Sequence, residues 1–308
     1  MSALTADLAP MIAASINAGT PLMLAALGLL INEKSGVVNL GAEGMMLVAA
    51  IVGFATAVNT GSVTAGFLAA AAAGMLLAGF FALLTVWLGT NQYATGLALA
   101  LFGSGASAYI GMDYVGHSLE NPKFALPFLS DMPFVGTALF KQHPMVYLSL
   151  LLCGAIILFL YRSRAGLVLR AVGESPSSAH ALGYDVRLIR LAALLFGGAC
   201  CGLAGAFMSL VYTPMWVEGM VAGRGWIALA LTTFATWRPA RVMIGAYLFG
   251  GVTIMTFHAQ GLGVSIASQW LSMLPYLATI VVLVLISTNA TWIKLNMPAS
   301  LGKNFHPH

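Results

Sequence analysis

Long runs of uncharged, mostly apolar residues divide the chain, and each run has room for at least one membrane-crossing helix. At 1.5 Å rise per residue, about 20 apolar residues cover the hydrocarbon core of a bilayer. The runs predict one span between residues 7 and 33, three between residues 43 and 113, and one between residues 141 and 162. Five spans are therefore expected before residue 162.

The second half of the chain is less regular. A sixth span is predicted between residues 190 and 218, and two more between residues 241 and 294, with the polar stretch 260–269 as their turn. Residues 217–237 form a doubtful span because charged residues interrupt it. The total is eight or nine, and we expect nine.

The runs are continuous and rich in Ala and Leu, without the alternation of period two that a membrane β-barrel requires. Helices satisfy their own backbone hydrogen bonds inside a bilayer. The fold class predicted is therefore all-α, a polytopic bundle of about nine transmembrane helices. We expect residues 1–308 to form a single transmembrane domain with a cytoplasmic loop at 162–190 and an outer loop at 113–143.

Basic residues predict the orientation, because Lys and Arg in short loops are retained on the cytoplasmic side. If the Arg-rich loop 162–190 is inside, alternation of the spans places ten basic residues inside and three outside. The N-terminus is then outside and the C-terminus inside. An eight-span count would place both termini on one side, so the doubtful segment decides this point. The outside three are Lys123, Lys141 and Arg224.

Composition narrows the class of protein. Hydrophobic residues make up 60% of the chain and charged residues only 7%, with a mean hydropathy of +0.92, which excludes a water-soluble globular domain. The net charge of +4 is scattered between apolar runs and forms no basic face, so nucleic-acid binding is not expected. The chain is read as an integral membrane protein in contact with lipid.

The cysteine, histidine and glycine residues are spaced as in packed helices and not as in disulfide, metal or catalytic sites. Cys153, Cys200 and Cys201 are odd in number, lack CxxC spacing and lie in apolar runs, so we expect buried thiols. The histidines show no ligand spacing, and no metal site or catalytic residue is predicted. The small-residue pairs Gly197/Cys201 and Gly198/Gly202 favour close helix packing inside one bundle over a dimer face.

The loop 162–190 contains signals for a short helix outside the membrane. Ser175 is a plausible N-cap, Pro176 fits the first helical position, and Gly183 supplies a C-terminal stop. A surface linker helix and a docking element explain these signals equally well on physical grounds alone.

A family resemblance favours the docking element. The string Glu174-Ser-Pro-x-x-Ala179-x-x-x-Gly183, preceded by Arg170-Ala-Val-Gly, resembles the coupling loop of ABC importer permeases in the branched-chain amino acid, simple sugar and nucleoside group. Residues 32–46, 223–230 and 237–239 are similar to other motifs of these permeases. Residues 91–96 and 127–133 look closest to the smaller permease of bacterial nucleoside importers. The resemblance covers nearly the whole chain, although Lys34 replaces the usual Arg and residues 232–236 are less aliphatic than expected.

The resemblance implies a division of labour among several polypeptides. Such a permease lies in the bacterial inner membrane, where it pairs with a second, related permease. It couples to ABC ATPase subunits and receives solute from an extracytoplasmic binding protein. The chain has no G-x-x-x-x-G-K-[ST] phosphate loop, so ATP and Mg²⁺ are expected on the partner ATPase and no cofactor in this chain. The residues assigned by resemblance to ATPase coupling are Gly173, Glu174, Pro176, Ala179, Leu182 and Gly183.

Polar groups that lipid would not tolerate are candidates for a translocation path. They are Asn39, Glu43, Asn91, Gln92, Arg224 and Trp226. Glu43 fits equally well as a carboxylate stabilised by a helix N-terminus. Arg224 and Glu218 fit an outer surface loop better than the path, and Trp226 fits an interface anchor better than a base-stacking platform.

A path without net charge would suit a nucleoside, and equally a zwitterion or a sugar. From the resemblance we expect a nucleoside first, then a branched-chain amino acid or a simple sugar. An ion-gradient-driven secondary transporter remains the alternative from a different class, although Glu43 is the only embedded carboxylate that would suit it. A polytopic membrane enzyme would need a cluster of catalytic side chains that the sequence does not show.

Overall fold

The computed structural model of the chain describes residues 3–120, 134–261 and 296–305, and single positions at 270, 273, 274, 276, 277, 280, 281 and 284. This described part is helical, apart from one isolated bridge between Ser118 and Met215. Its α-helices are α1 (Ala3–Lys34), α2 (Ala42–Thr60), α3 (Val63–Ala82), α4 (Gln92–Gly111), α5 (Pro144–Arg162), α6 (Arg164–Glu174), α7 (Pro176–Ala181), α8 (Val186–Phe207), α9 (Arg224–Phe234) and α10 (Pro239–Gly261).

Short helical segments of other pitch extend three of these helices and precede a fourth. The π-helical turns η1 (Leu83–Trp87) and η4 (Met208–Tyr212) continue α3 and α8, and η3 (Gly136–Phe140) precedes α5. A 3₁₀ turn, η2 (Met112–Tyr114), follows α4. These extensions lengthen α3, α4 and α8 to the dimensions of a bilayer.

Seven helices in the described part are long and apolar enough to cross a membrane. They are Leu8–Lys34, Ala42–Thr60, Val63–Trp87, Gln92–Tyr114, Pro144–Arg162, Val186–Tyr212 and Pro239–Gly261. The first six coincide with the six spans predicted before residue 218, three of which share the single uncharged run 43–113. The turn expected at 260–269 and most of the following span lie outside the described residues, where only single helical positions from 270 to 284 are defined.

The doubtful segment 217–237 contains no helix long enough to cross a membrane by itself. Its only helix, α9, has 11 residues and is about 16 Å long, roughly half of a bilayer core. Left-handed backbone conformations flank it, with Gly223 at φ 80° before it and Thr236 and Trp237 at φ 49° and 52° after it. Such conformations cost about 1–3 kcal/mol for a residue with a side chain, so surrounding contacts must hold them. The described residues thus show seven helices long enough to cross a membrane and one half-length helix, and they do not confirm the nine spans that we expected.

α3 packs backbone to backbone against α8, and this is the most extensive contact between two helices in the described part of the chain. A Cβ atom on Gly74 would lie 2.1 Å from the Gly198 carbonyl oxygen, and one on Gly202 would lie 2.3 Å from the Ala70 carbonyl oxygen. Only glycine fits at such distances. The predicted small-residue packing inside one bundle is therefore confirmed.

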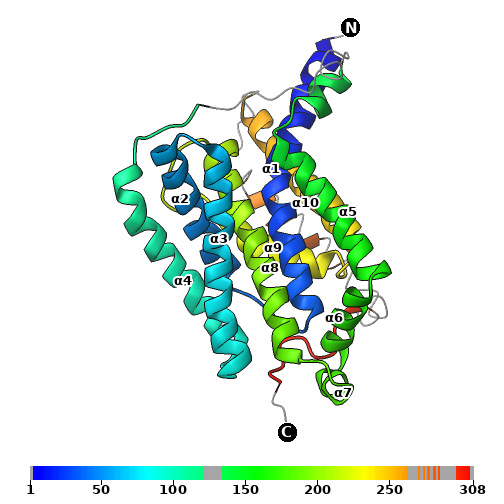
Figure 1. Ribbon diagram of the computed structural model, residues 1–308. Coiled ribbons are helices and arrows are strands. Elements are labelled where there is room, and N and C mark those ends of the chain that lie inside the picture. Colours follow the sequence, from blue (N-terminus) through cyan, green and yellow to red (C-terminus); the bar gives the residue numbers. More distant parts are fainter. Residues whose placement is uncertain are drawn as a thin grey trace.

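The elements divide between two ends of the bundle (Figure 1). The N-terminal end of α1 and the turn between α2 and α3 lie at the upper end in this view, together with the first residues of α5. The C-terminal end of α1, α6, α7 and residues 296–305 lie at the lower end. We refer to this lower end as the coupling end.

Candidate functional site

Two short helices at the coupling end form the segment in which the sequence predicted a docking element. α6 is followed at once by α7, whose N-cap is Ser175: its Oγ accepts a hydrogen bond from the Ser178 backbone N–H at 3.3 Å. Pro176 occupies the first helical position, and Gly183 follows with φ 89°. The local signals of cap, proline and glycine therefore produce the short helix that they predicted.

The candidate coupling residues fall into an inner and an outer set. Ala179 is buried against Val172 and Val186, and Gly173 packs so closely on α1 that a Cβ there would lie 2.2 Å from the Lys34 carbonyl oxygen. Leu182 is 77% exposed. The inner set fixes α7 on the bundle, while Leu182 and Gly183 remain open to a partner.

The predicted loop 162–190 is shorter than expected at its C-terminal side. α8 begins at Val186, and Arg190 lies inside it with only 2% of its surface exposed. Its guanidinium donates to the backbone oxygens of Ser35 and Lys303, both at 3.2 Å, and to the Ser300 Oγ at 3.4 Å. Arg190 is thus a buried connection between three segments and not a surface cation of the loop.

Glu43 joins α2 to the N-terminus of α9, deep in the bundle. Its carboxylate accepts hydrogen bonds from the backbone N–H groups of Gly223 at 2.8 Å and Gly225 at 2.7 Å. The neighbouring Gly44 packs on residues 99–103 in the middle of α4, which shows that Glu43 lies deep in the bundle. Glu43 also lies in the first turn of α2, so its carboxylate is close to two helix N-termini, which agrees with one of the alternatives predicted for it.

Arg224 and Trp226 lie beside this junction. The Arg224 guanidinium is 5.6 Å from the centre of the Tyr212 ring and donates to the backbone oxygens of Met220 and Val221. Trp226 is 37% exposed. Arg224 thus belongs to the first turn of the half-length helix, where its charge opposes that of Glu43, while Glu218 is exposed in the segment before it.

Each of the three amide side chains proposed for the path makes a hydrogen bond to another group of the protein. The Asn39 Oδ1 accepts from the Gly41 N–H at 3.0 Å, and Asn91 is the exposed N-cap of α4. Gln92 is buried, accepts from the Val38 N–H at 2.9 Å and donates to the Asn304 Oδ1 at 3.2 Å. Asn91 and Gln92 lie near the coupling end, while Glu43, Arg224 and Trp226 gather midway along the bundle.

A second buried carboxylate, Glu33, was not selected from the sequence. It lies near the end of α1 and accepts hydrogen bonds from the Thr232 hydroxyl and the Trp237 indole N–H, which flank the C-terminal end of α9. Each end of α9 is therefore held by one carboxylate, Glu43 at its start and Glu33 at its end. The unexpected Thr232 in an otherwise aliphatic run was the only sequence signal for this contact.

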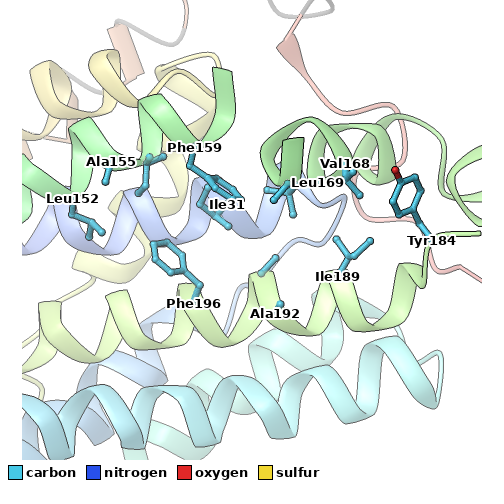
Figure 2. A pocket seen from close by; sticks show the side chains of 13 residues that line it. Ile31, Leu152, Ala155, Phe159, Val168, Leu169, Tyr184, Ile189, Ala192 and Phe196 are labelled. Atoms are coloured by element: carbon cyan, nitrogen blue, oxygen red, sulfur yellow. The ribbon is translucent and has the colours of Figure 1, made fainter. Parts of the chain in front are cut away.

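An apolar groove of about 670 Å³ runs between α5 and α8 near the coupling end (Figure 2). Leu152 and Phe159 from α5 face Ala192 and Phe196 from α8, and Ile31 of α1 lies between them. The Tyr184 hydroxyl is the sole side-chain polar group in this lining. The groove therefore gives a polar solute almost nothing to bind, and it is not our candidate path.

Among the residues that the structure describes, no three His, Cys, Asp or Glu side chains form a group that could hold a metal ion. All three cysteines are free and buried, as predicted.

Comparison with known proteins gives one consistent family. Residues 11–286 match the family described as "Branched-chain amino acid transport system / permease component". The chain is 38% identical to the "Putative glucose ABC transporter permease protein TsgC13" of Haloferax volcanii, over 95% of this chain and 96% of that protein. It is 30% identical to the nucleoside ABC transporter permease NupC of Lactococcus lactis, over 86% and 88% of the two chains. It is 28% identical to the guanosine permease NupQ of Bacillus subtilis, over 85% and 87%. No solved structure matches the chain significantly.

Proposed function

This chain belongs to the permease family of ABC importers for branched-chain amino acids, sugars and nucleosides, and we propose that it forms the transmembrane path for an uncharged solute that contains a sugar ring. Membership of this family argues against an ion-gradient-driven secondary transporter, the alternative that the sequence analysis left open. The chain is a multi-pass membrane protein.

The solute class rests on the relatives and on the charges along the proposed path. Two relatives are named for nucleosides and one for glucose, and both solutes carry a hydroxylated sugar ring without net charge. In the middle of the bundle the charge of Glu43 is opposed by that of Arg224 and satisfied by backbone N–H groups. A charged solute would therefore find no uncompensated partner charge at this point, in a medium of low dielectric constant. A nucleoside is our first candidate, because two of the three relatives are named for one.

The segment from Gly173 to Gly183 is the proposed contact with the ATPase. The observation that carries this assignment is the exposure of Leu182 directly after a helix that Ala179 anchors on the bundle. A short helix fixed on one side can transmit a rigid-body tilt to the rest of the bundle. ATP and Mg²⁺ would then act on the partner subunit and not on this chain.

The orientation and the complete span count also belong to this proposal. The coupling end carries Lys34, Arg170 and Arg238, whose charges interact, together with the Arg-rich α6. Basic residues concentrate on the cytoplasmic side, so the coupling end would face the cytoplasm and the N-terminal end of α1 the outside. α10 runs antiparallel to α1, since Ala246 faces Gly19 and Gly250 faces Ser15, so α10 ends on the side where α1 begins. Residues 296–305 lie at the coupling end, and the last predicted span would return the chain to that side.

Co-purification tests the assembly. The tagged chain, extracted gently from its native membrane, should carry an ABC ATPase and a second permease that mass spectrometry identifies. The same complex in vesicles with its binding protein should take up labelled uridine or glucose in an ATP-dependent manner. Uptake of leucine, and of neither ring-bearing solute, would overturn the proposed solute class.

An insertion mutant tests the proposed role of the segment from Gly173 to Gly183 separately from the solute class. Two glycines inserted after Ser177 in α7 should abolish ATPase binding or uptake, because they rotate and displace Leu182. The control is the same insertion at Gly61, an open turn with no atom near a Cβ position, and this variant should retain both activities. Intact ATPase binding and uptake in the α7 variant would show that the assignment is wrong.

A further inference from the structure

Residues 296–305 cross the coupling end and contact segments that are far apart in the sequence (Figure 1). The segment is largely irregular, yet almost every residue in its middle makes a hydrogen bond to another element. No sequence pattern marked it, because its partners are mostly backbone carbonyl groups. We call this segment the C-terminal strap.

One set of contacts binds the strap to the coupling helices. Ser300 donates both its backbone N–H and its hydroxyl to the Gly173 carbonyl oxygen, at 3.0 and 2.6 Å. Phe305 packs against the buried cluster beneath α7, and its ring is 5.6 Å from that of His180. The strap therefore holds the end of α6 and the inner face of α7.

A second set binds the strap to the bundle. Asn304 donates to the carbonyl oxygens of Gly89 and Thr90 at 2.6 and 3.1 Å, in the turn that precedes α4, and accepts from Gln92. The Gly302 N–H donates to the Gly36 carbonyl oxygen at 3.1 Å, in the turn after α1. Arg190 in α8 donates to the strap at Ser300 and Lys303.

These contacts connect α7 and α4, which share no direct contact among the principal helix pairs. The hydrogen bonds are multiple and partly buried, and each bond to a main-chain oxygen would have to break if the two helices moved apart. A bend at Ser300 or Asn304 would also leave buried carbonyl groups without a donor.

From this geometry we propose that the C-terminal strap positions the coupling helices relative to α4, so that α7 and the start of α4 move as one body when the ATPase acts. Asn304 and Phe305 are the positioning residues, one at each end of the connection. The inference rests on the proposed role of α7 in contacting the ATPase.

Spin labels can test this without knowledge of the solute. Cysteines introduced at Ser177 of α7 and Leu97 of α4, both exposed, accept labels, while the three native cysteines are buried. The distance between the labels is measured by pulsed electron resonance in the purified complex with its ATPase, before and after trapping with ATP and vanadate. The strap predicts one distance in both states.

Removing either end should uncouple the two helices. In Asn304→Ala and in Phe305→Ala, vanadate trapping should shift the distance or add a second population displaced by about one helical turn, roughly 5 Å. Phe305→Leu, which keeps the apolar packing, should restore the single distance. The matched control is Lys303→Ala, because the Lys303 side chain is exposed and its hydrogen bonds are made by the backbone N–H and carbonyl groups.

Two results would overturn the proposal: a wild-type distance that itself changes on trapping, or alanine variants that match the wild type in both states. A purely structural role would reduce the yield of complex without a nucleotide-dependent shift. Loss of the ATPase from the wild-type preparation would instead contradict the proposed function, so the two failures are distinguishable.

Discussion

Substitution of Glu43 by glutamine removes a carboxylate that is bonded to the start of α9. The carboxylate accepts two backbone N–H groups at 2.8 and 2.7 Å, and neither donor has an intrahelical partner at a helix N-terminus. Glutamine has a single acceptor oxygen, and its NH₂ group would face the second N–H. Hydrogen bonds to charged groups contribute about 1.5–3 kcal/mol each. Loss of one such bond and weakening of the other should cost roughly 2–4 kcal/mol.

The assay is the thermal unfolding midpoint of the purified complex in detergent. At roughly 2 °C per kcal/mol for a chain of this size, Glu43→Gln should lower the midpoint by roughly 4–8 °C. Glu218→Gln changes an exposed carboxylate in the preceding segment and should leave it unchanged. A Glu43→Gln midpoint within 1 °C of the wild type, as in that control, would refute the reasoning that this carboxylate holds α9.

Two further predictions concern the packed core. Gly198→Ala should markedly reduce the yield of folded protein, because its Cβ would lie 2.4 Å from the Gly74 carbonyl oxygen. Gly154→Ala, where a Cβ would enter open space, should be neutral or slightly stabilising. Gel filtration of the solubilised variants measures both yields, and equal yields would contradict the packing argument. Cys200 and Cys201 are fully buried, so a maleimide should leave them unmodified in the native membrane and react after denaturation; rapid native labelling would contradict their burial.

The spacing of charges predicted the first six crossing helices because an isolated charge is costly in lipid and marks the end of a run. The same argument could not resolve residues 217–237. There the chain forms a half-length helix, and its start is satisfied by Glu43, which is 180 residues away in the sequence. A long-range partner of this kind leaves no local pattern. Hydropathy alone could therefore not show that the helix in this segment has only half the length of a membrane span.

The candidate site was predictable in its local parts and not in its connections. Ser175, Pro176 and Gly183 specify α7 through rules that act within a few residues. Gln92 was selected for a path because an amide is rare in an apolar run, yet it bonds to Val38 and Asn304. Whether an intramembrane polar group lines a path or ties segments together depends on tertiary neighbours, which periodicity does not contain.

The contact of α3 with α8 has a mechanical consequence. Where backbone meets backbone at Gly74 and Gly198, no flexible side chain lies between the helices to absorb a sliding motion. The two helices can rotate together but cannot shear past each other without forcing carbonyl oxygens against Cα atoms. Any alternation between inward-open and outward-open shapes must therefore use another seam. One such seam lies between α5 and α8, where the apolar groove already separates the helices.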